Sequence, residues 1–303
     1  MKVSWNIGIS VAAVVAISAL SIAPEASYAQ DKGKNPGADQ GLIPPAEADP
    51  GLNGGRLDRR KGKRGPSRPT PHWPDGRVNL GPLPGEKGVW EGNAGSTLAT
   101  NLRNGIDNAT MNLPTNMKIS EVPFQPWAGA VYGYRQGSTT KDDPHVKCKP
   151  SGGPRMFHTP YGFEFIDVPE LKRIFVVGVG GPHTWRPIYM DGRPHPAELE
   201  PTFAGHSVGH LEGDALVVDT LGYNERFWLT REGIPSTSAL HLTERFTRTD
   251  YDTLRYDATI DDPGAYTKPW TGGWLIRWQD AELYEYVCQD NNRDVEHMYG
   301  GER

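Results

Sequence analysis

Residues 240–260 read LHLTERFTRTDYDTLRYDATI, and their alternation decides the fold class. Successive side chains of a β-strand point to opposite faces, so an alternating run has one apolar and one polar face. Residues 240–246 follow this pattern, and residues 253–260 repeat it. The segment between the two runs contains Asp250-Tyr251-Asp252, a compact polar break. The stretch therefore predicts an antiparallel hairpin.

Similar runs occur through the second half of the chain. Turn residues such as Asp191-Gly192 and Glu212-Gly213-Asp214 separate them, as hairpin connections require. The expected strands span 161–168, 171–179, 184–190, 203–211, 214–221, 239–248, 253–260, 273–279 and 282–288. Many short strands with little helix between them favour an all-β domain. We expect an antiparallel barrel, with a β-sandwich as the alternative, and one short helix at 128–136 that has Pro126 near its first turn.

Composition limits the size of the folded domain. The 303-residue chain is 36% hydrophobic and contains 36 Gly and 27 Pro, whereas soluble domains are roughly 45–50% apolar. Residues 30–88 are rich in Gly, Pro and basic side chains, which predicts a disordered linker. Within this irregular N-terminal arm, the first isolated apolar anchors lie between 71 and 90. A single barrel domain is then expected at 89–303.

The basic cluster of this linker, between Arg56 and Arg68, has a second interpretation as an electrostatic tether to anionic surface polymers. The whole chain has a formal net charge of −5. A nucleic-acid-binding domain usually presents a strongly basic face. No nucleic-acid partner is therefore expected.

Residues 1–29 have the pattern of a secretory signal peptide. Lys2 precedes an apolar run from Ile7 to Ile22, and Ser27-Tyr28-Ala29 matches a small-x-small cleavage site. The run is shorter than the roughly 20 residues of a membrane-spanning helix. We expect cleavage after Ala29 and a periplasmic or secreted protein without a transmembrane segment. The alternative is an uncleaved N-terminal anchor.

Cys148 and Cys288 are the two cysteines of the chain. In an oxidising compartment an even number of cysteines indicates a disulfide. A reactive thiol would need an adjacent base, and neither local sequence supplies a decisive one. The pair is therefore expected to be a structural bridge.

Glu244 interrupts an apolar face, because residues 242, 244 and 246 of a strand point to the same side and its two neighbours there are Leu242 and Phe246. Tyr256 lies on the corresponding face of the next strand, and Trp274 and Trp278 follow on the strand after it. Trp, Tyr and a carboxylate facing one interior favour a ligand cavity. The alternative is that Glu244 forms a structural ion pair with an inward-facing arginine.

Seven groups of residues lie between 74 and 293: PFQPW at 123–127, DDP at 142–144 with Cys148, GGPR at 152–155, HTWR at 183–186, YMDGR at 189–193, GHSVG at 205–209, and EGD at 212–214 with VVDT at 217–220. Together they resemble a family of exported, mostly uncharacterised proteins from environmental bacteria. The resemblance implies no activity and assigns no catalytic residue. Residues 240–260 are also similar in pattern to lipocalin-like barrels, which makes the expected fold an antiparallel lipocalin-like barrel.

The densest polar region of the sequence spans 155–195. Histidine exchanges protons near neutral pH, arginine holds a developing anion, and tyrosine donates to an oxygen. The expected catalytic residues are His183 and His158 for proton transfer, Arg186 with Tyr189 for anion stabilisation, and Glu244 as base or orienting carboxylate. The expected substrate-binding residues are Trp185, Tyr256, Trp274 and Trp278. The alternative is that His183 and Arg186 hydrogen-bond loop carbonyls.

His206 and His210 form a second candidate pair. In an ideal strand, their positions are about 13 Å apart, too far for one metal ion without a bend at Gly209. A metal site would then take a further ligand from His158 or His183. This metal-binding interpretation is an alternative to the lead hypothesis.

The lead hypothesis is an exported enzyme without an organic cofactor. It performs acid–base chemistry (lyase, isomerase or hydrolase) on a small, partly apolar, aromatic or terpenoid compound. The first alternative is a periplasmic protein that binds a hydrophobic ligand without catalysis, and the second is a histidine-ligated metalloprotein. The segment 222–238, which contains Arg231-Glu232, is long enough to cover a barrel mouth.

Overall fold

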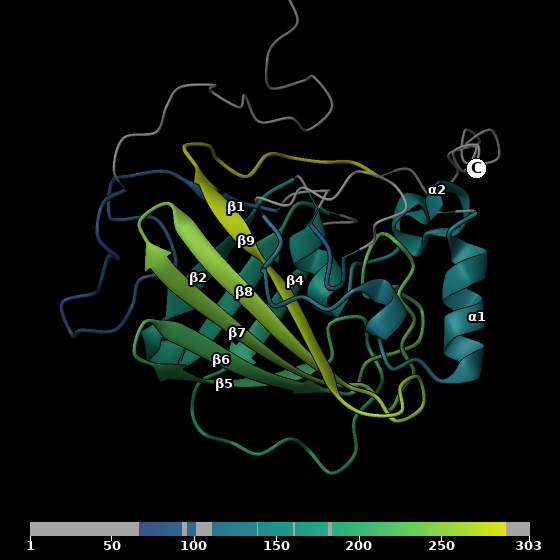
Figure 1. Ribbon diagram of the computed structural model, residues 1–303. Helices are drawn as coiled ribbons and strands as arrows, with labels where there is room; N and C mark the ends of the chain where they lie inside the picture. The colour runs from purple at the N-terminus through teal and green to yellow at the C-terminus, as the bar shows by residue number, and fades with distance from the viewer. Residues whose placement is uncertain are drawn as a thin grey trace, which may run out of the picture. The chain divides into compact units, whose positions relative to one another are not determined.

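The computed structural model describes residues 67–92, 96–100, 111–137, 139–159, 161–180 and 184–288 and consists of a closed β-barrel with short helices (Figure 1). The strands are β1 (Val89–Glu91), β2 (Phe163–Val168), β3 (Arg173–Gly178), β4 (Trp185–Tyr189), β5 (His206–Glu212), β6 (Ala215–Leu221), β7 (His241–Asp250), β8 (Thr253–Asp261) and β9 (Trp270–Gln279). The helices are α1 (Pro126–Arg135), α2 (Thr139–Asp142) and the 3-10 turns η1 (Ile119–Glu121), η2 (Pro144–Lys147), η3 (Gly153–His158) and η4 (Pro169–Leu171). The predicted signal peptide, residues 1–29, and residues 30–66 of the predicted linker lie outside the described residues.

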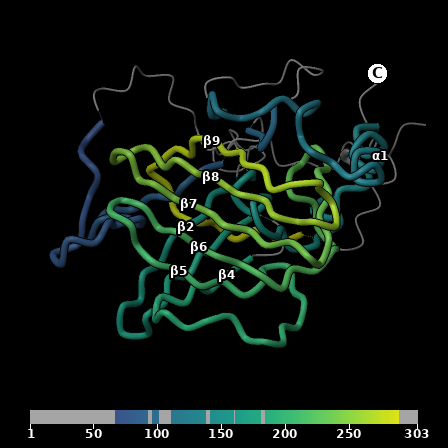
Figure 2. Tube along the Cα trace, turned by 60° about the horizontal axis from the view of Figure 1, so that its bottom comes forward, coloured from purple at the N-terminus to yellow at the C-terminus, as the bar shows by residue number. Residues whose placement is uncertain are grey.

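Each strand pairs with the next one in the chain, and β9 pairs with β1 to close the barrel. The all-β barrel expected from the sequence is therefore confirmed. One pair differs from the antiparallel expectation, because β4 and β5 run parallel, with Ile188 opposite Ser207. A parallel pair needs a long crossover, and residues 190–205 supply it. Figure 2 shows this crossover looping out beside β4 and β5.

Two strand assignments from the sequence need correction. Residues 282–288 form no strand; they are held by the Cys148–Cys288 disulfide and by the Tyr286 ring, which lies 5.2 Å from that of Tyr161. The ninth strand is instead β1, which the alternation does not reveal because it is three residues long and follows Gly88. Gly88 is required because a Cβ there would meet the Trp278 ring at 2.1 Å.

The predicted helix is present as α1 and begins at Pro126. Pro at the first position costs no hydrogen bond, since that N–H has no partner within a helix. Arg135 at its last turn lies over the Trp228 ring at 4.7 Å and donates to the carbonyl of Gly233. Helix α1 therefore packs against the segment 222–238, in which Phe227, Trp228 and Ile234 are buried.

The folded domain begins before residue 89, its expected start, and includes the isolated apolar anchors that the sequence marks between 71 and 90. Val78 and Leu80 are buried in the hydrophobic core. The Arg248 guanidinium, also buried, donates to the carbonyls of Asn79 and Gly81, and the Trp90 indole donates to that of Leu80 at 2.6 Å. Two isolated apolar anchors and three backbone acceptors thus fix residues 78–81 to the barrel.

The barrel interior is filled with aromatic side chains. Phe157, carried inward by η3, contacts the rings of Phe163, Phe246 and Tyr256 at centroid distances of 4.9, 4.9 and 5.3 Å. Edge-to-face and tilted contacts at these distances are the preferred arrangements of aromatic pairs. The centre of the barrel is therefore a packed core around Phe157.

The expected disulfide is also present. It joins Cys148, directly after η2, to Cys288 across 140 residues of sequence. It fastens the segment after β9 to the helical segment before β2. In the described part of the chain, no helix is both long and apolar enough to cross a membrane.

Candidate acid–base site

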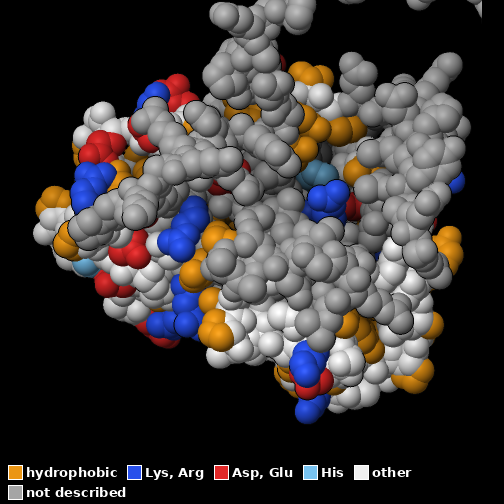
Figure 3. All heavy atoms as spheres, turned by 45° about the horizontal axis from the view of Figure 1, so that its top comes forward, with side chains coloured by type: hydrophobic (Ala, Val, Ile, Leu, Met, Phe, Trp, Pro, Cys, Tyr) orange, Lys and Arg blue, Asp and Glu red, His pale blue; other side chains and the backbone are white. Residues whose placement is uncertain are grey.

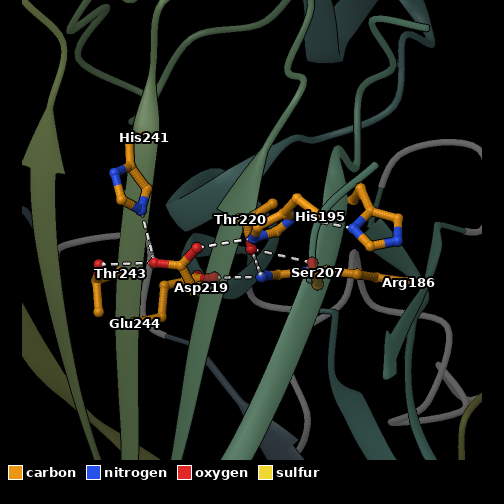
Figure 4. A network of polar contacts seen from close by, with 9 residues as sticks. Arg186, His195, Ser207, Asp219, Thr220, His241, Thr243 and Glu244 are labelled. Atoms are coloured by element: carbon orange, nitrogen blue, oxygen red, sulfur yellow. Dashed lines mark hydrogen bonds and ion pairs between the residues drawn. The ribbon is translucent and has the colours of Figure 1, made fainter. Parts of the chain in front are cut away.

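A buried polar network crosses the barrel interior between β4 and β8. Arg186 donates to Glu244 at 2.5 Å, to Thr220 at 2.7 Å and to Ser207 at 2.8 Å. Tyr256 donates to the second oxygen of Glu244 at 2.9 Å. Figure 4 shows Arg186 reaching from one side toward Thr220 and Glu244. The sequence predicts the inward positions of Glu244 and Tyr256 from alternation, and the structure shows that they contact one another and Arg186.

The network is poorly suited to proton exchange at neutral pH. Burial lowers the pKa of the Arg186 guanidinium, but the adjacent Glu244 carboxylate outweighs this effect and raises it above its usual value. Burial and the charge of Glu244 raise the pKa of the Tyr256 hydroxyl well above its ordinary range. The network therefore resembles the structural ion pair that was the alternative interpretation of Glu244.

His158 lies at the end of η3 and is fully buried. Its Nδ1 atom accepts a hydrogen bond from the backbone N–H of Arg231 at 3.3 Å. In a neutral imidazole the proton then resides on Nε2, and this atom lies 4.0 Å from Oε1 of Glu232. The Trp274 ring lies 5.5 Å from the imidazole and forms an apolar wall. A backbone contact thus directs the second nitrogen of His158 toward a carboxylate.

Glu232 is less buried than this histidine, although its Oε2 atom is itself buried. It lies in the segment 222–238, and its side chain is 23% exposed. Burial raises its pKa, while hydrogen bonds from its own backbone and Thr230 and the charges of Arg155 and Arg231 act in the opposite direction. A carboxyl group with a raised pKa can both release and accept a proton closer to neutral pH. The sequence gives no periodic signal for Glu232, because it lies in an irregular segment.

Two polar contacts hold η3 in place. Arg155 of η3 donates to Asp143 at 2.7 Å, and both side chains are buried. His145 lies 2.8 Å from the Ser151 hydroxyl. Burial, followed by the charge of Arg155, lowers the pKa of His145 to about 4. His145 is therefore neutral near pH 7 and supports the entry to η3 as an uncharged group.

On the face seen in Figure 3, a histidine side chain lies in a hollow beside a basic and an acidic side chain, with apolar side chains at its rim.

The structure separates the remaining predicted site residues. His183 lies outside the described residues. Trp185 is 62% exposed, and Tyr189 stacks on His206 at 5.0 Å. Trp278 contacts Trp90 and the guanidinium of Arg248 rather than Trp274. Of the expected substrate-binding set, Tyr256 and Trp274 contact each other, at 4.8 Å.

His206 and His210 have different partners. His210 lies 2.9 Å from Glu212, whereas His206 Nδ1 lies 2.9 Å from Nδ1 of His195. Among the residues that the structure describes, no three His, Cys, Asp or Glu side chains form a group that could hold a metal ion. The alternative metal site of His206, His210 and His158 is therefore not assembled in the described residues, and His183 lies outside them.

No family model, curated protein or solved structure matches the chain. Membership in a family of exported proteins therefore stays a prediction.

Proposed function

We propose that the protein is an exported acid–base enzyme, without an organic cofactor, that acts on a small, partly apolar compound. Glu232 exchanges a proton with the substrate, and His158, which packs against Trp274, supports the charge of Glu232. The observation that carries the proposal is the orientation of His158, whose Nδ1 is held by a backbone N–H so that Nε2 faces Glu232. Lyase, isomerase and hydrolase reactions all require such proton transfer.

In this proposal Glu232 is the group that meets the substrate, because it is the partly exposed member of the pair. His158 stabilises the charge that Glu232 gains or loses. Their separation of 4.0 Å exceeds a hydrogen bond, and catalytic hydrogen bonds often shorten only when substrate binds. Arg186 and Glu244 contribute by fixing the barrel rather than by contacting substrate.

The packed interior argues against the hydrophobic-ligand carrier. A carrier needs a cavity lined by the inward aromatic residues. Tyr256 and Trp274 are fully buried against neighbouring side chains. The disulfide supports the exported part of the proposal, since such bonds persist in oxidising compartments.

A generic proton-abstraction substrate tests the assignment before the natural substrate is known. The base-catalysed ring opening of 5-nitrobenzisoxazole is followed by absorbance for the wild type, Glu232→Gln and His158→Gln. Loss of a general base typically costs about 10²–10⁴-fold in rate, so we expect at least a hundredfold loss in Glu232→Gln. The wild-type rate should rise with pH through the raised pKa of Glu232.

Glu225→Gln is the matched control, because Glu225 is a carboxylate of the same segment that accepts a hydrogen bond from the Ser238 backbone. It should retain the wild-type rate. Equal rates for the wild type and Glu232→Gln, or a rate no higher than that of buffer, would contradict the proposal.

A further inference from the structure

A second polar cluster lies on the outer face of the barrel, away from the acid–base site. His195 belongs to the crossover 190–205, and His206 is the first residue of β5. Their Nδ1 atoms are 2.9 Å apart, and their rings are inclined at 71°. Two neutral imidazole nitrogens at this distance share one proton. The contact joins the crossover to the sheet through two groups that are also good metal ligands.

Asp219 of β6 fixes the orientation of His195. Its carboxylate lies 2.8 Å from Nε2 of His195 and 2.6 Å from Nε2 of His241. Thr243 donates to the same carboxylate at 3.5 Å. An ionised carboxylate only accepts hydrogen bonds, so Nε2 of His195 is the donor, and a neutral His195 presents a lone pair on Nδ1. Figure 4 shows Asp219 between His195 and His241.

This arrangement matches the support that metal-binding histidines have in proteins. A ligating histidine commonly donates its other N–H to a carboxylate, which fixes the tautomer and raises the basicity of the ligand. His206 is fixed in a different way, because the Tyr189 ring stacks on it at 5.0 Å. Both imidazoles are therefore oriented before any ion binds.

We propose that His195 and His206 form a binding site for a divalent late transition-metal ion. Among these ions, the site binds Cu²⁺ most tightly. Two nitrogens in neighbouring positions of a square-planar ion, at about 2.0–2.1 Å from it, are about 2.9 Å apart. The Nδ1–Nδ1 separation of 2.9 Å is that of the hydrogen bond between the two rings, and it also matches this spacing. Cu²⁺ favours square-planar nitrogen and oxygen ligands and stands highest in the affinity order of divalent metals. Water completes the coordination.

The local charges permit a cation. Asp219 contributes a negative charge on the far side of His195. Arg193 and Arg173 both lie over the Tyr189 ring that stacks on His206, and Arg193 forms a bidentate ion pair with Asp191. The side chain of His195 is 15% exposed and His206 is half-buried, which leaves a route from solvent. Binding requires the proton of His206 to move from Nδ1 to Nε2 through solvent, with no change in oxidation state.

The test is a Cu²⁺ titration of the full-length protein, purified without a histidine tag and with its disulfide intact. Isothermal calorimetry gives the stoichiometry and affinity, and electron paramagnetic resonance reports nitrogen ligation. We expect one saturable ion with two nitrogen ligands. His206→Ala should abolish this binding. Asp219→Asn should weaken it about 10–100-fold, the usual effect of losing a supporting carboxylate.

His210→Ala is the matched control, because His210 lies on the same strand and contacts Glu212 instead. It should bind Cu²⁺ with wild-type affinity. Wild-type affinity in His206→Ala, or a wild type without a saturable site, would show that the His195–His206 contact only anchors the crossover. His195→Ala, with its fold checked by circular dichroism, gives an independent second measurement. Ring opening of 5-nitrobenzisoxazole should be unchanged in His206→Ala, which separates this inference from the proposed function.

Discussion

The Arg186–Glu244 pair shows how one buried charge determines its surroundings. Both side chains are buried, and each has further polar neighbours in Ser207, Thr220 and Tyr256. A buried ion pair adds little net stability, because desolvation offsets the attraction. Removing one partner is costly, however, because the other charge stays buried without compensation.

Arg186→Met should therefore lower the free energy of unfolding by about 3–5 kcal/mol. Urea denaturation monitored by tryptophan fluorescence measures the loss. The double variant Arg186→Met/Glu244→Gln removes the orphaned charge and keeps an acceptor for the Tyr256 hydroxyl. It should recover part of the stability. A double variant less stable than Arg186→Met would contradict the assignment of the pair.

His145 makes stability depend on pH. Its pKa is about 4 in the folded protein, lowered first by burial and then by Arg155, against roughly 6.5 in an unfolded chain. Between these two pKa values, the unfolded state therefore binds a proton on His145 that the folded state does not bind. Stability is fully present above about pH 6.5 and is lost as the pH falls toward 4, by up to about 3 kcal/mol.

His145→Gln removes this titration and keeps a polar group near Ser151. Its free energy of unfolding should fall less steeply than that of the wild type between pH 7 and pH 4.5. Urea midpoints at a series of pH values provide the comparison. Parallel curves for the two proteins would assign the acid sensitivity to other groups.

Sequence alternation predicts which residues face inward but not which of them meet. Glu244 and Arg186 are both found from the sequence, and their pairing depends on a register across several strands that spacing along one strand does not contain. Glu232 is missed because irregular segments carry no period. His206 is found, whereas its partner His195 comes from the crossover, whose path is a tertiary property.

At the scale of elements, strong periodicity predicts β2 to β9 within a few residues, whereas the three-residue β1 and the parallel pairing of β4 with β5 are missed. The β7–β8 hairpin is bounded by a polar turn and alternates cleanly, so its strands at 241–250 and 253–261 lie near the expected ranges. The parallel pairing of β4 with β5 has no local signature, because a crossover and a hairpin differ in where the chain returns. The three residues of β1 are too few for a period.

Strand β9 contains a position that tests how closely its neighbours pack. A Cβ on Gly272 would lie 2.0 Å from the carbonyl oxygen of Leu98, which is backbone and cannot rotate away. Gly272→Ala should therefore destabilise the protein by about 1–3 kcal/mol or more. Thermal unfolding measured by circular dichroism reports the change.

Gly133→Ala in α1 is the matched control, since nothing lies within 4 Å of its Cβ position. Alanine is favoured over glycine in a helix by roughly 1 kcal/mol. This variant should be as stable as the wild type or more so. A Gly272→Ala protein with the melting temperature of Gly133→Ala would show that residues 96–100 do not press on β9.

At the scale of the whole molecule, the barrel depends on a segment that composition assigns to a linker. Residues 67–88 are rich in Pro and Gly, yet Val78 and Leu80 enter the core. Composition averages over the whole segment. It therefore does not show that Val78 and Leu80 pack at particular places in the barrel core. The same segment supplies backbone carbonyl acceptors to the Arg248 guanidinium, which lies among the rings of Trp90 and Trp278.

Comparing a chain that begins at Ser67 with one that begins at Val89 tests whether the folded domain needs residues 67–88. Burying an aliphatic side chain is worth about 1.5–3 kcal/mol, and the shorter chain loses two such side chains, Val78 and Leu80. It also loses the Asn79 and Gly81 acceptors of Arg248 and the Leu80 acceptor of Trp90, so the guanidinium keeps the Tyr251 carbonyl but loses two of its acceptors, and the indole N–H loses its acceptor. The shorter chain should lose several kcal/mol of stability in urea denaturation. Equal midpoints would place the start of the folded domain at residue 89, because the barrel would then need no part of the arm to close its core.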